Sequence, residues 1–153
     1  NKLIEDGSDN IPVTDVKMTR FWITLQQGVD FVLTNFKRMQ GGEIFVPKIP
    51  SVRITDLANA MAPNLPQIII GIRPGEKLHE IMCPADDSHL TLEFDDHFVI
   101  KPTIQFIVNT DFKINMVGEK GVLVKQGFEF NSGKPTRFLN IGEINEMNKQ
   151  SAD

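Results

Sequence analysis

One stretch of the chain combines residue types and spacings that suit the binding of a phosphate. The apolar run Ile68–Ile72 predicts a short buried strand, and Pro74-Gly75 predicts a tight turn directly after Arg73. Residues Lys77–Ile81 have helical spacing, so we expect a helix to begin after the turn. A helix start directs backbone N–H groups and a positive dipole at one point, and arginine adds a planar cationic fork.

The same residues also have an ordinary explanation, which composition alone favours. Arg73 can be a surface arginine, Pro-Gly is frequent in turns, and Glu76 can belong to a solvated helix face. The pair His79-Glu80 lacks the second histidine of an H-E-x-x-H zinc helix, so we expect no metal. His97 is bracketed by apolar residues and is expected to be structural.

Composition limits the classes of protein to which the chain can belong. Its 153 residues are 41% hydrophobic and 24% charged, which suits a single globular core. The net charge of −4 leaves no basic field for nucleic acid or an anionic membrane. No apolar run reaches the roughly 18 residues that span a bilayer, and the single cysteine, Cys83, is expected to be a buried thiol. We therefore expect a cytoplasmic protein that binds neither nucleic acid nor membrane.

Three long motifs carry a resemblance to a known family. They are MTRFWITLQQGVDFVL at 18–33, GGEIFVPKIPSVRITDLANAMAPN at 41–64 and IGIRPGEKLHE at 70–80. Together they resemble the C-terminal part of the inverting UDP-N-acetylglucosamine 4,6-dehydratases, which are extended short-chain dehydrogenase/reductase enzymes of the pseudaminic acid pathway. The resemblance extends from Ile11 to Pro102 and becomes loose beyond Thr103.

The resemblance implies a function for the intact enzyme and a role for this chain. The enzyme would oxidise the sugar at C4 with bound NADP, eliminate water across C5 and C6, and return the hydride with inversion at C5. The chain has no G-x-G-x-x-G turn and no tyrosine for a Y-x-x-x-K pair, so we expect no catalytic or cofactor-binding residue in it. We expect the intact enzyme to be a homo-oligomer.

The family's substrate contacts can be carried to four positions. Arg73 would pair with the diphosphate of the UDP-sugar, Thr14 and Thr136 would hydrogen-bond the nucleotide or the sugar, and Glu76 or Lys77 would orient the loop. Taken alone, Thr14 is an ordinary turn residue, and the match around Thr136 is poor. These four residues are the predicted substrate-binding site.

The predicted fold is α/β, with the dinucleotide-binding half of the Rossmann-type enzyme missing and a β-rich C-terminal tail. We expect residues 1–10 to be a tail left from truncation, 11–102 to be the sugar-nucleotide-binding part, and 103–153 to be a β-rich extension. Helices are expected from Thr24 and Thr55, each with an apolar face left partly uncovered. The remaining expected elements are a strand at 18–23, a strand at 43–46, a hairpin at 90–100, strands at 104–108, 121–124 and 128–130, and a helix at 141–149 with little apolar face.

Two other functions remain open at this point. The chain could be a catalytically inactive interaction domain derived from the same scaffold. It could also belong to a related dehydratase that retains the configuration at C5, or to an epimerase. The sequence upstream of Asn1 would separate an enzyme from an inactive interaction domain, because an enzyme needs the G-x-G-x-x-G and Y-x-x-x-K motifs in frame.

Overall fold

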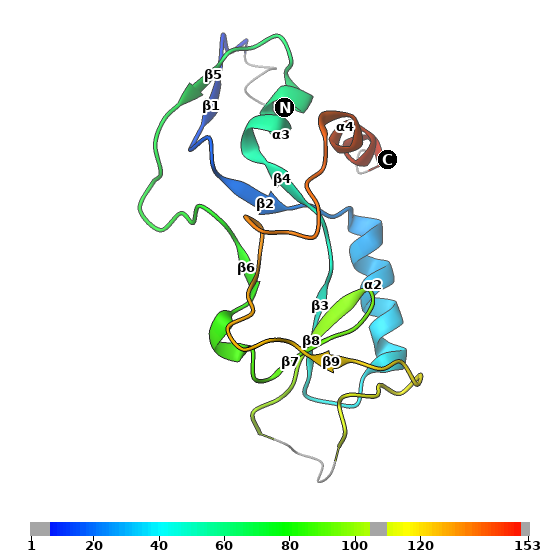
Figure 1. Cartoon of the computed structure of the whole chain (residues 1–153). Coiled ribbons are helices and arrows are strands. Elements are labelled where there is room, and N and C mark those ends of the chain that lie inside the picture. The colour runs from blue at the N-terminus through cyan, green and yellow to red at the C-terminus, as the bar shows by residue number, and fades with distance from the viewer. Residues whose placement is uncertain (1–6, 105–109, 151–153) are drawn as a thin grey trace. The chain divides into compact units, whose positions relative to one another are not determined.

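The computed structural model describes residues 7–104 and 110–150, which form a mixed α/β structure with parallel and antiparallel strand pairs. The chain divides into two compact units (Figure 1). The first unit consists of Asn1–Thr24, Ile49–Glu80 and Ser132–Asp153, and the second of Leu25–Lys48 and Ile81–Asn131. Each unit is described separately below.

The first unit contains two strand pairs and two helices. Strand β1 (Ile11–Val13) pairs in parallel with β5 (Gln67–Ile69), and β2 (Thr19–Phe21) pairs antiparallel with β4 (Ser51–Arg53). Helices α3 (Ile54–Met61) and α4 (Ile141–Gln150) pack against each other. The core of this unit is formed by Val52, Leu139 and Ile144, with Trp22, Leu57, Ala60 and Met147 packed around them.

The second unit is built on a four-stranded antiparallel sheet. Its strand order is β3 (Ile44–Pro47), β8 (His97–Ile100), β7 (Thr91–Glu93) and β9 (Val122–Leu123). A further antiparallel pair joins β6 (Ile81–Cys83) to β10 (Phe130–Asn131). Helix α2 (Leu25–Arg38) and the short 3-10 helix η1 (Ala85–Asp87) complete the unit.

Strand β8 lies at the centre of this sheet and is buried along its whole length. Because side chains alternate across a strand, one face carries Val99, which packs with Leu92, Phe94 and Phe112. On the other face, Phe98 contacts the rings of Phe128 and Phe130 with centroids 5.1 and 5.0 Å away. The expected hairpin around Asp95-Asp96 is confirmed, since β7 and β8 pair in register.

Helix α2 begins directly after Thr24, as expected, but it packs on an unexpected face. Asn35 and Arg38 are buried in the second unit, and Phe31 contacts the His97 ring. The apolar residues of the helix, Leu25, Val29, Val32, Leu33 and Phe36, are exposed within the described residues. The physical reason is that Arg38 finds two carboxylates in its own unit. The expectation of an uncovered apolar face is confirmed for this helix.

Several other expectations were wrong. No helix follows Gly75, because the backbone there pairs with other segments: the carbonyls of Leu78 and Glu80 accept hydrogen bonds from the amides of Thr19 and Ser132. Helix α3 begins at Ile54, and its N-cap is Arg53 rather than Thr55. Helix α4 was expected to have little apolar face, yet its Ile144 is fully buried and its Met147 packs against the same core. The strand expected at 104–108 lies almost entirely outside the described residues.

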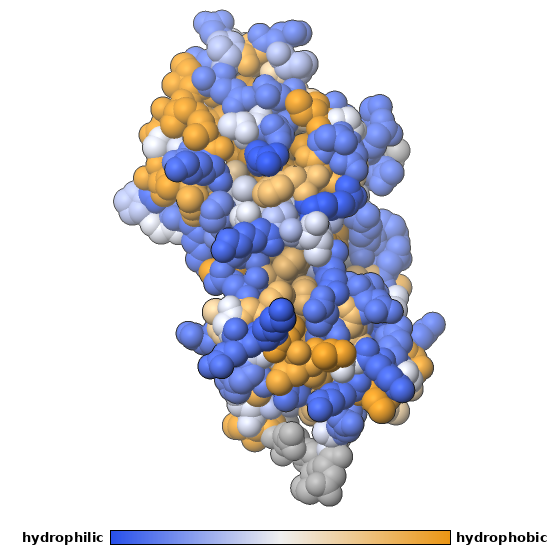
Figure 2. All heavy atoms as spheres, viewed as in Figure 1, coloured by the Kyte–Doolittle hydropathy of each residue, from blue (hydrophilic) through white to orange (hydrophobic). Residues whose placement is uncertain are grey.

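The run Ile68–Ile72 was expected to be buried, but Ile68, Ile69, Ile70 and Ile72 are all exposed. Only the start of the run is a strand, and it pairs with β1 alone. A parallel pair is normally covered on both faces, which explains why its sequence is so apolar. Apolar side chains gather over this pair at the upper left of Figure 2. Among the described residues, no helix has the length and hydrophobicity needed to cross a membrane.

Candidate functional site

The predicted turn at Pro74-Gly75 is present and presents Arg73 to solvent. The Glu76 amide donates to the Arg73 carbonyl at 3.0 Å, and Gly75 has a φ of 85°, as the third residue of a type II turn requires. The Arg73 side chain is 71% exposed. The Arg73 guanidinium is therefore carried by a turn whose central residues, Pro74 and Gly75, are the ones that a type II turn prefers.

Glu76 binds Arg73 from within the same turn. Its Oε1 accepts from Arg73 Nε at 2.9 Å and lies 2.8 Å from Nη2, while its Oε2 accepts from the Arg73 backbone amide at 3.1 Å. Hydrogen bonds from the backbone amide and then the side chain of Arg73 lower the pKa of Glu76. No hydrogen bond to Arg73 Nη1 occurs within 7–104 and 110–150, so the outer edge of the guanidinium is open to a ligand. Glu76 therefore ties both the backbone and the side chain of Arg73 to this turn.

The segments that carry Thr14 and Arg73 follow the carboxyl ends of the two paired strands, β1 and β5. Thr14 follows Val13, whose carbonyl accepts from the Ile70 amide at 2.9 Å. The carboxyl ends of parallel strands are the usual position of ligand sites in α/β folds. Thr14 is half-buried there, beside the start of the segment that carries Arg73.

Thr136 is exposed in the segment between β10 and α4 of the same unit. Within the parts of the chain that the structure describes, no hydrogen bond or ion pair joins it to Thr14, Arg73 or Glu76. The structure therefore links Arg73 to Glu76 directly and to Thr14 through the strand pair. The substrate roles of all four residues stay predictions.

A cluster that the motifs did not indicate lies in the first unit. His79 Nδ1 is 2.8 Å from Thr19 Oγ1, which in turn is 2.8 Å from Ser132 Oγ. Thr19 and Ser132 are buried, and His79 is half-buried. These residues lie 60 and 113 positions apart in the sequence, so no local pattern could have paired them. The only sequence signal was the position of His79 within the RPGEKLHE motif.

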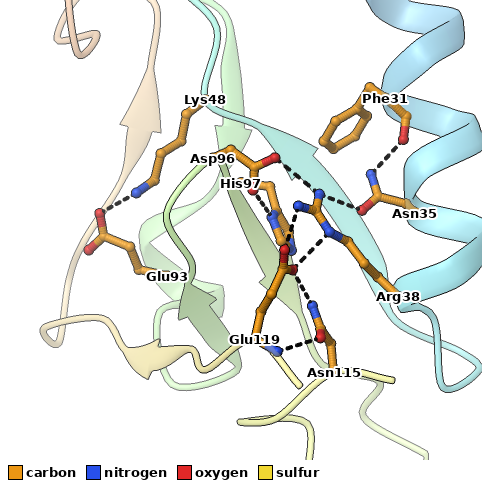
Figure 3. Close-up of polar contacts among 9 residues, drawn as sticks. All are labelled: Phe31, Asn35, Arg38, Lys48, Glu93, Asp96, His97, Asn115 and Glu119. Carbon is orange, nitrogen blue, oxygen red and sulfur yellow. Dashed lines mark hydrogen bonds and ion pairs between the residues drawn. The ribbon is translucent and has the colours of Figure 1, made fainter. Parts of the chain in front are cut away.

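The second unit holds a charged cluster centred on Arg38, whose side chain is only 9% exposed (Figure 3). Its Nε lies 2.8 Å from Glu119 Oε2, its Nη2 donates to Glu119 Oε1 at 3.0 Å, and its Nη1 donates to Asp96 at 3.1 Å. Asp96 also binds His97 Nδ1 at 2.6 Å. His97 is fully buried, as expected of a structural histidine, and stacks on Phe94 with ring centroids 4.7 Å apart, but its Nε2 has no hydrogen-bond partner among the described residues.

The cluster shifts the acid–base behaviour of its members. Burial by itself would raise the pKa of Asp96, but hydrogen bonds from His97 and Arg38 outweigh it and lower that pKa. The hydrogen bond from Arg38 is the main reason that the pKa of Glu119 is lowered. Burial by itself would lower the pKa of Arg38, but its hydrogen bonds to Glu119 and Asp96 outweigh this effect and raise that pKa. The cluster is thus a structural ion-pair network that anchors α2 to its sheet.

We expect Arg38→Gln to lower the free energy of unfolding by about 1–2 kcal/mol at neutral pH, because it removes charge-assisted bonds to partly exposed carboxylates. A carboxylate with a lowered pKa stabilises the fold above its unfolded pKa, and this contribution is lost as the pH falls through the lower folded pKa. The difference in the free energy of unfolding between wild type and Arg38→Gln should therefore become smaller once the pH falls below the ordinary pKa values of Asp96 and Glu119, which are 3.8 and 4.5.

Urea denaturation at a series of pH values measures this difference. Arg137→Gln is the matched control, since Arg137 forms an exposed pair with Glu143, and its effect should be within about 0.5 kcal/mol. If Arg38→Gln lowers the free energy of unfolding by the same amount from about pH 7 to about pH 3, then the ion pairs of Arg38 with Asp96 and Glu119 are not the source of the lost stability.

The described residues contain no group of three or more His, Cys, Asp or Glu side chains placed to hold a metal ion. Cys83 is fully buried, as expected. Burial, with a smaller contribution from the charge of Asp87, raises the pKa of its thiol to about 12. A thiol with so high a pKa is not a nucleophile at neutral pH.

Comparisons with known proteins point to sugar-nucleotide enzymes. Residues 1–102 match a family model described as polysaccharide biosynthesis protein. The chain is 61% identical over 147 residues to the UDP-N-acetylglucosamine 4,6-dehydratase (inverting) of Campylobacter jejuni, covering 95% of this chain and 44% of the relative. It is 28% identical over 148 residues to the UDP-glucose 4-epimerase of Rickettsia canadensis, covering 94% of this chain and 42% of that relative.

A solved structure has a similar fold. The X-ray structure of Pen from Bacillus thuringiensis superposes with a TM-score of 0.73 at 26% sequence identity, covering 97% of this chain and 44% of that chain. The chain therefore spans less than half the length of these relatives.

Proposed function

The chain belongs to the polysaccharide biosynthesis protein family, and from this premise we propose that it is the substrate-binding part of an inverting UDP-N-acetylglucosamine 4,6-dehydratase. The observation that carries the proposal is the 61% identity with such an enzyme over 95% of the chain. The full-length protein, as proposed, dehydrates a UDP-amino sugar in the cytoplasm, in the first step of pseudaminic acid biosynthesis, and forms a homo-oligomer.

The geometry of the first unit supports this assignment. Arg73 offers a free guanidinium edge on a turn that Glu76 orients, which suits two oxygens of a diphosphate. Thr14 lies at the carboxyl edge of β1–β5, where a hydroxyl can hydrogen-bond the nucleotide. Thr136, on the exposed segment before α4, is the proposed contact to the sugar or nucleotide on the C-terminal side.

The residues of this chain do not fit a dinucleotide cofactor. The sequence holds no G-x-G-x-x-G and no tyrosine, and β1 leads into a bend and a turn rather than a helix. NADP and the groups that move protons and hydride would therefore belong to the part of a full-length protein outside this chain. This chain would grip and orient the substrate.

The proposal predicts that the isolated chain has no dehydratase activity and that the full-length protein has it. Each is incubated with UDP-N-acetylglucosamine and NADP, and mass spectrometry detects the loss of water from the sugar. Proton NMR of the product then reports the configuration at C5. A dehydrated product made by the isolated chain would contradict the proposed division of labour. A full-length protein that leaves the substrate intact would overturn the proposed function.

A further inference from the structure

Helix α2 packs on the sheet of the second unit with one side only. The packed side carries Phe31, Asn35 and Arg38, and the ring of Phe31 contacts the ring of His97 in β8. Another set of side chains recurs at spacings of four, three and four, and therefore forms a separate stripe along the helix. The members of this α2 stripe, all exposed among the described residues, are Leu25, Val29, Val32 and Phe36.

Strand β3, which follows α2 in the chain, has a free edge in the same unit. It pairs with β8 in register, and the Lys48 amide beyond its end donates to the Asp96 carbonyl at 3.0 Å. Because bonded and non-bonded pairs alternate in an antiparallel ladder, Val46 and Ile44 also form hydrogen bonds with β8. The backbone amide and carbonyl of Phe45 therefore point away from β8, to a side where the described part of the chain places no strand.

The α2 stripe and the free edge belong to one packed structure. The ring of His97 lies 6.4 Å from that of Phe31 in α2 and 5.6 Å from that of Phe45 in β3, measured between centroids. Figure 1 shows α2 beside β3 and β8. An exposed apolar stripe on a helix next to a strand with an open edge is typical of an α/β layer that continues into another segment.

The length of the relatives indicates where that segment lies. The chain covers 44% of the Campylobacter jejuni dehydratase, so more than half of a protein of that length lies outside it. An added length of this size is enough for several strands and helices. It can therefore supply both a strand for the edge of β3 and an apolar surface for the α2 stripe.

A second copy of the chain fits the free edge less well. If two β3 strands paired antiparallel about Phe45, Pro47 of each copy would face Glu43 of the other. Proline has no N–H, so two of the hydrogen bonds of this ladder would be missing. A strand from elsewhere in the polypeptide meets Pro47 only once and loses only one bond.

We infer that a strand from the part of the full-length protein outside this chain pairs with the Phe45 edge of β3, and that apolar side chains of the same part cover the α2 stripe. The inference rests on the proposed function only for the premise that the chain is part of a longer enzyme. The second unit is then a packing surface between two parts of one polypeptide.

Hydrogen exchange at single amides in the full-length protein tests the added strand. The control is Leu123 in β9, at the opposite edge of the same sheet. The neighbouring Val124 amide donates to Thr91 at 3.1 Å, so the Leu123 amide points away from β7 as the Phe45 amide points away from β8. After correction for intrinsic rates, we expect the Phe45 amide to exchange at least about tenfold more slowly than the Leu123 amide.

Two matched substitutions in the full-length protein test the α2 stripe. Val32 in the stripe and Val122 in β9 are 55% and 72% exposed within the described residues. We expect Val32→Lys to lower the melting temperature by about 5 °C or more, because it places an ammonium group against an apolar surface. Val122→Lys should change it by less than about 2 °C. Sedimentation should show the same number of subunits in wild type and both variants.

Three results would overturn the inference. Equal exchange of the Phe45 and Leu123 amides would show that no strand is added to β3. An unchanged melting temperature of Val32→Lys would show that the α2 stripe faces solvent in the full-length protein. Dissociation of Val32→Lys into folded subunits would show that a second copy covers the stripe. A full-length protein that meets both expectations and yet leaves UDP-N-acetylglucosamine intact supports the inference and rejects the proposed function.

Discussion

Replacing Arg73 with lysine in the full-length protein is expected to weaken the binding of UDP by about ten- to a hundredfold, or about 1.5–3 kcal/mol. Glu76 already occupies the Nε and Nη2 edge of Arg73, which leaves the outer edge for two phosphate oxygens. An ammonium meets oxygens as a point charge and cannot serve Glu76 and a diphosphate in one plane. Net charge is unchanged, so only the local geometry differs.

Lys77→Arg is the matched control for this prediction. Lys77 is exposed one residue beyond Glu76, and no hydrogen bond or ion pair to its side chain occurs within the described residues. Its replacement should change affinity by no more than about 0.5 kcal/mol. Calorimetric titration of UDP into the two variants compares them directly. Equal affinities would mean that Arg73 is a surface arginine paired with Glu76 and contributes nothing to the ligand site.

The largest expected loss of stability comes from Leu92→Ala in the second unit, at about 2–5 kcal/mol. Leu92 is fully buried in the cluster with Phe94, Val99 and Phe112. Its strand lies between β8 and β9, so the surrounding side chains cannot collapse easily into the space that alanine leaves. The free energy of unfolding, measured in urea, gives the cost.

Leu33→Ala is the matched control, because it removes the same atoms from a leucine that is 57% exposed on α2. Its effect on the chain studied alone should be within about 0.5 kcal/mol. If the two substitutions cost the same, then either Leu92 lies outside the core or the apolar face of α2 is covered by another molecule. Sedimentation of the Leu33→Ala variant distinguishes these cases, since a covered face implies association.

Local signals predicted the parts of the fold that local interactions determine. The hairpin was readable because apolar residues alternate on both sides of Asp95-Asp96, and the turn after Arg73 because Pro-Gly suits one turn type. The start of α2 was also predicted. These features depend on residues within a few positions of one another.

The features that sequence reasoning missed depend on distant partners. Arg38 turns inwards because Glu119, 81 positions away, is its partner, and no periodicity contains that information. The segment after Gly75 has helical spacing, but its carbonyls are taken by Thr19 and Ser132. The hydrogen bonds that join His79, Thr19 and Ser132 likewise connect residues far apart in the sequence. The contact between Arg73 and Glu76 could thus be predicted, because the two residues are neighbours in one turn, whereas the contacts of His79 could not.

The interleaving of the two units has a consequence for the order in which the chain folds during synthesis. The first unit needs residues Ser132–Asp153, which include Leu139 and Ile144 of its core. The second unit ends at Asn131. On the ribosome, the second unit can therefore fold while β1, β2 and α3 are already outside the exit tunnel without their core partners. Residues Ile81–Asn131 of the second unit lie between Glu80 and Ser132 of the first unit in the sequence. Once these residues are folded, less conformational entropy is lost when Ser132–Asp153 join the rest of the first unit.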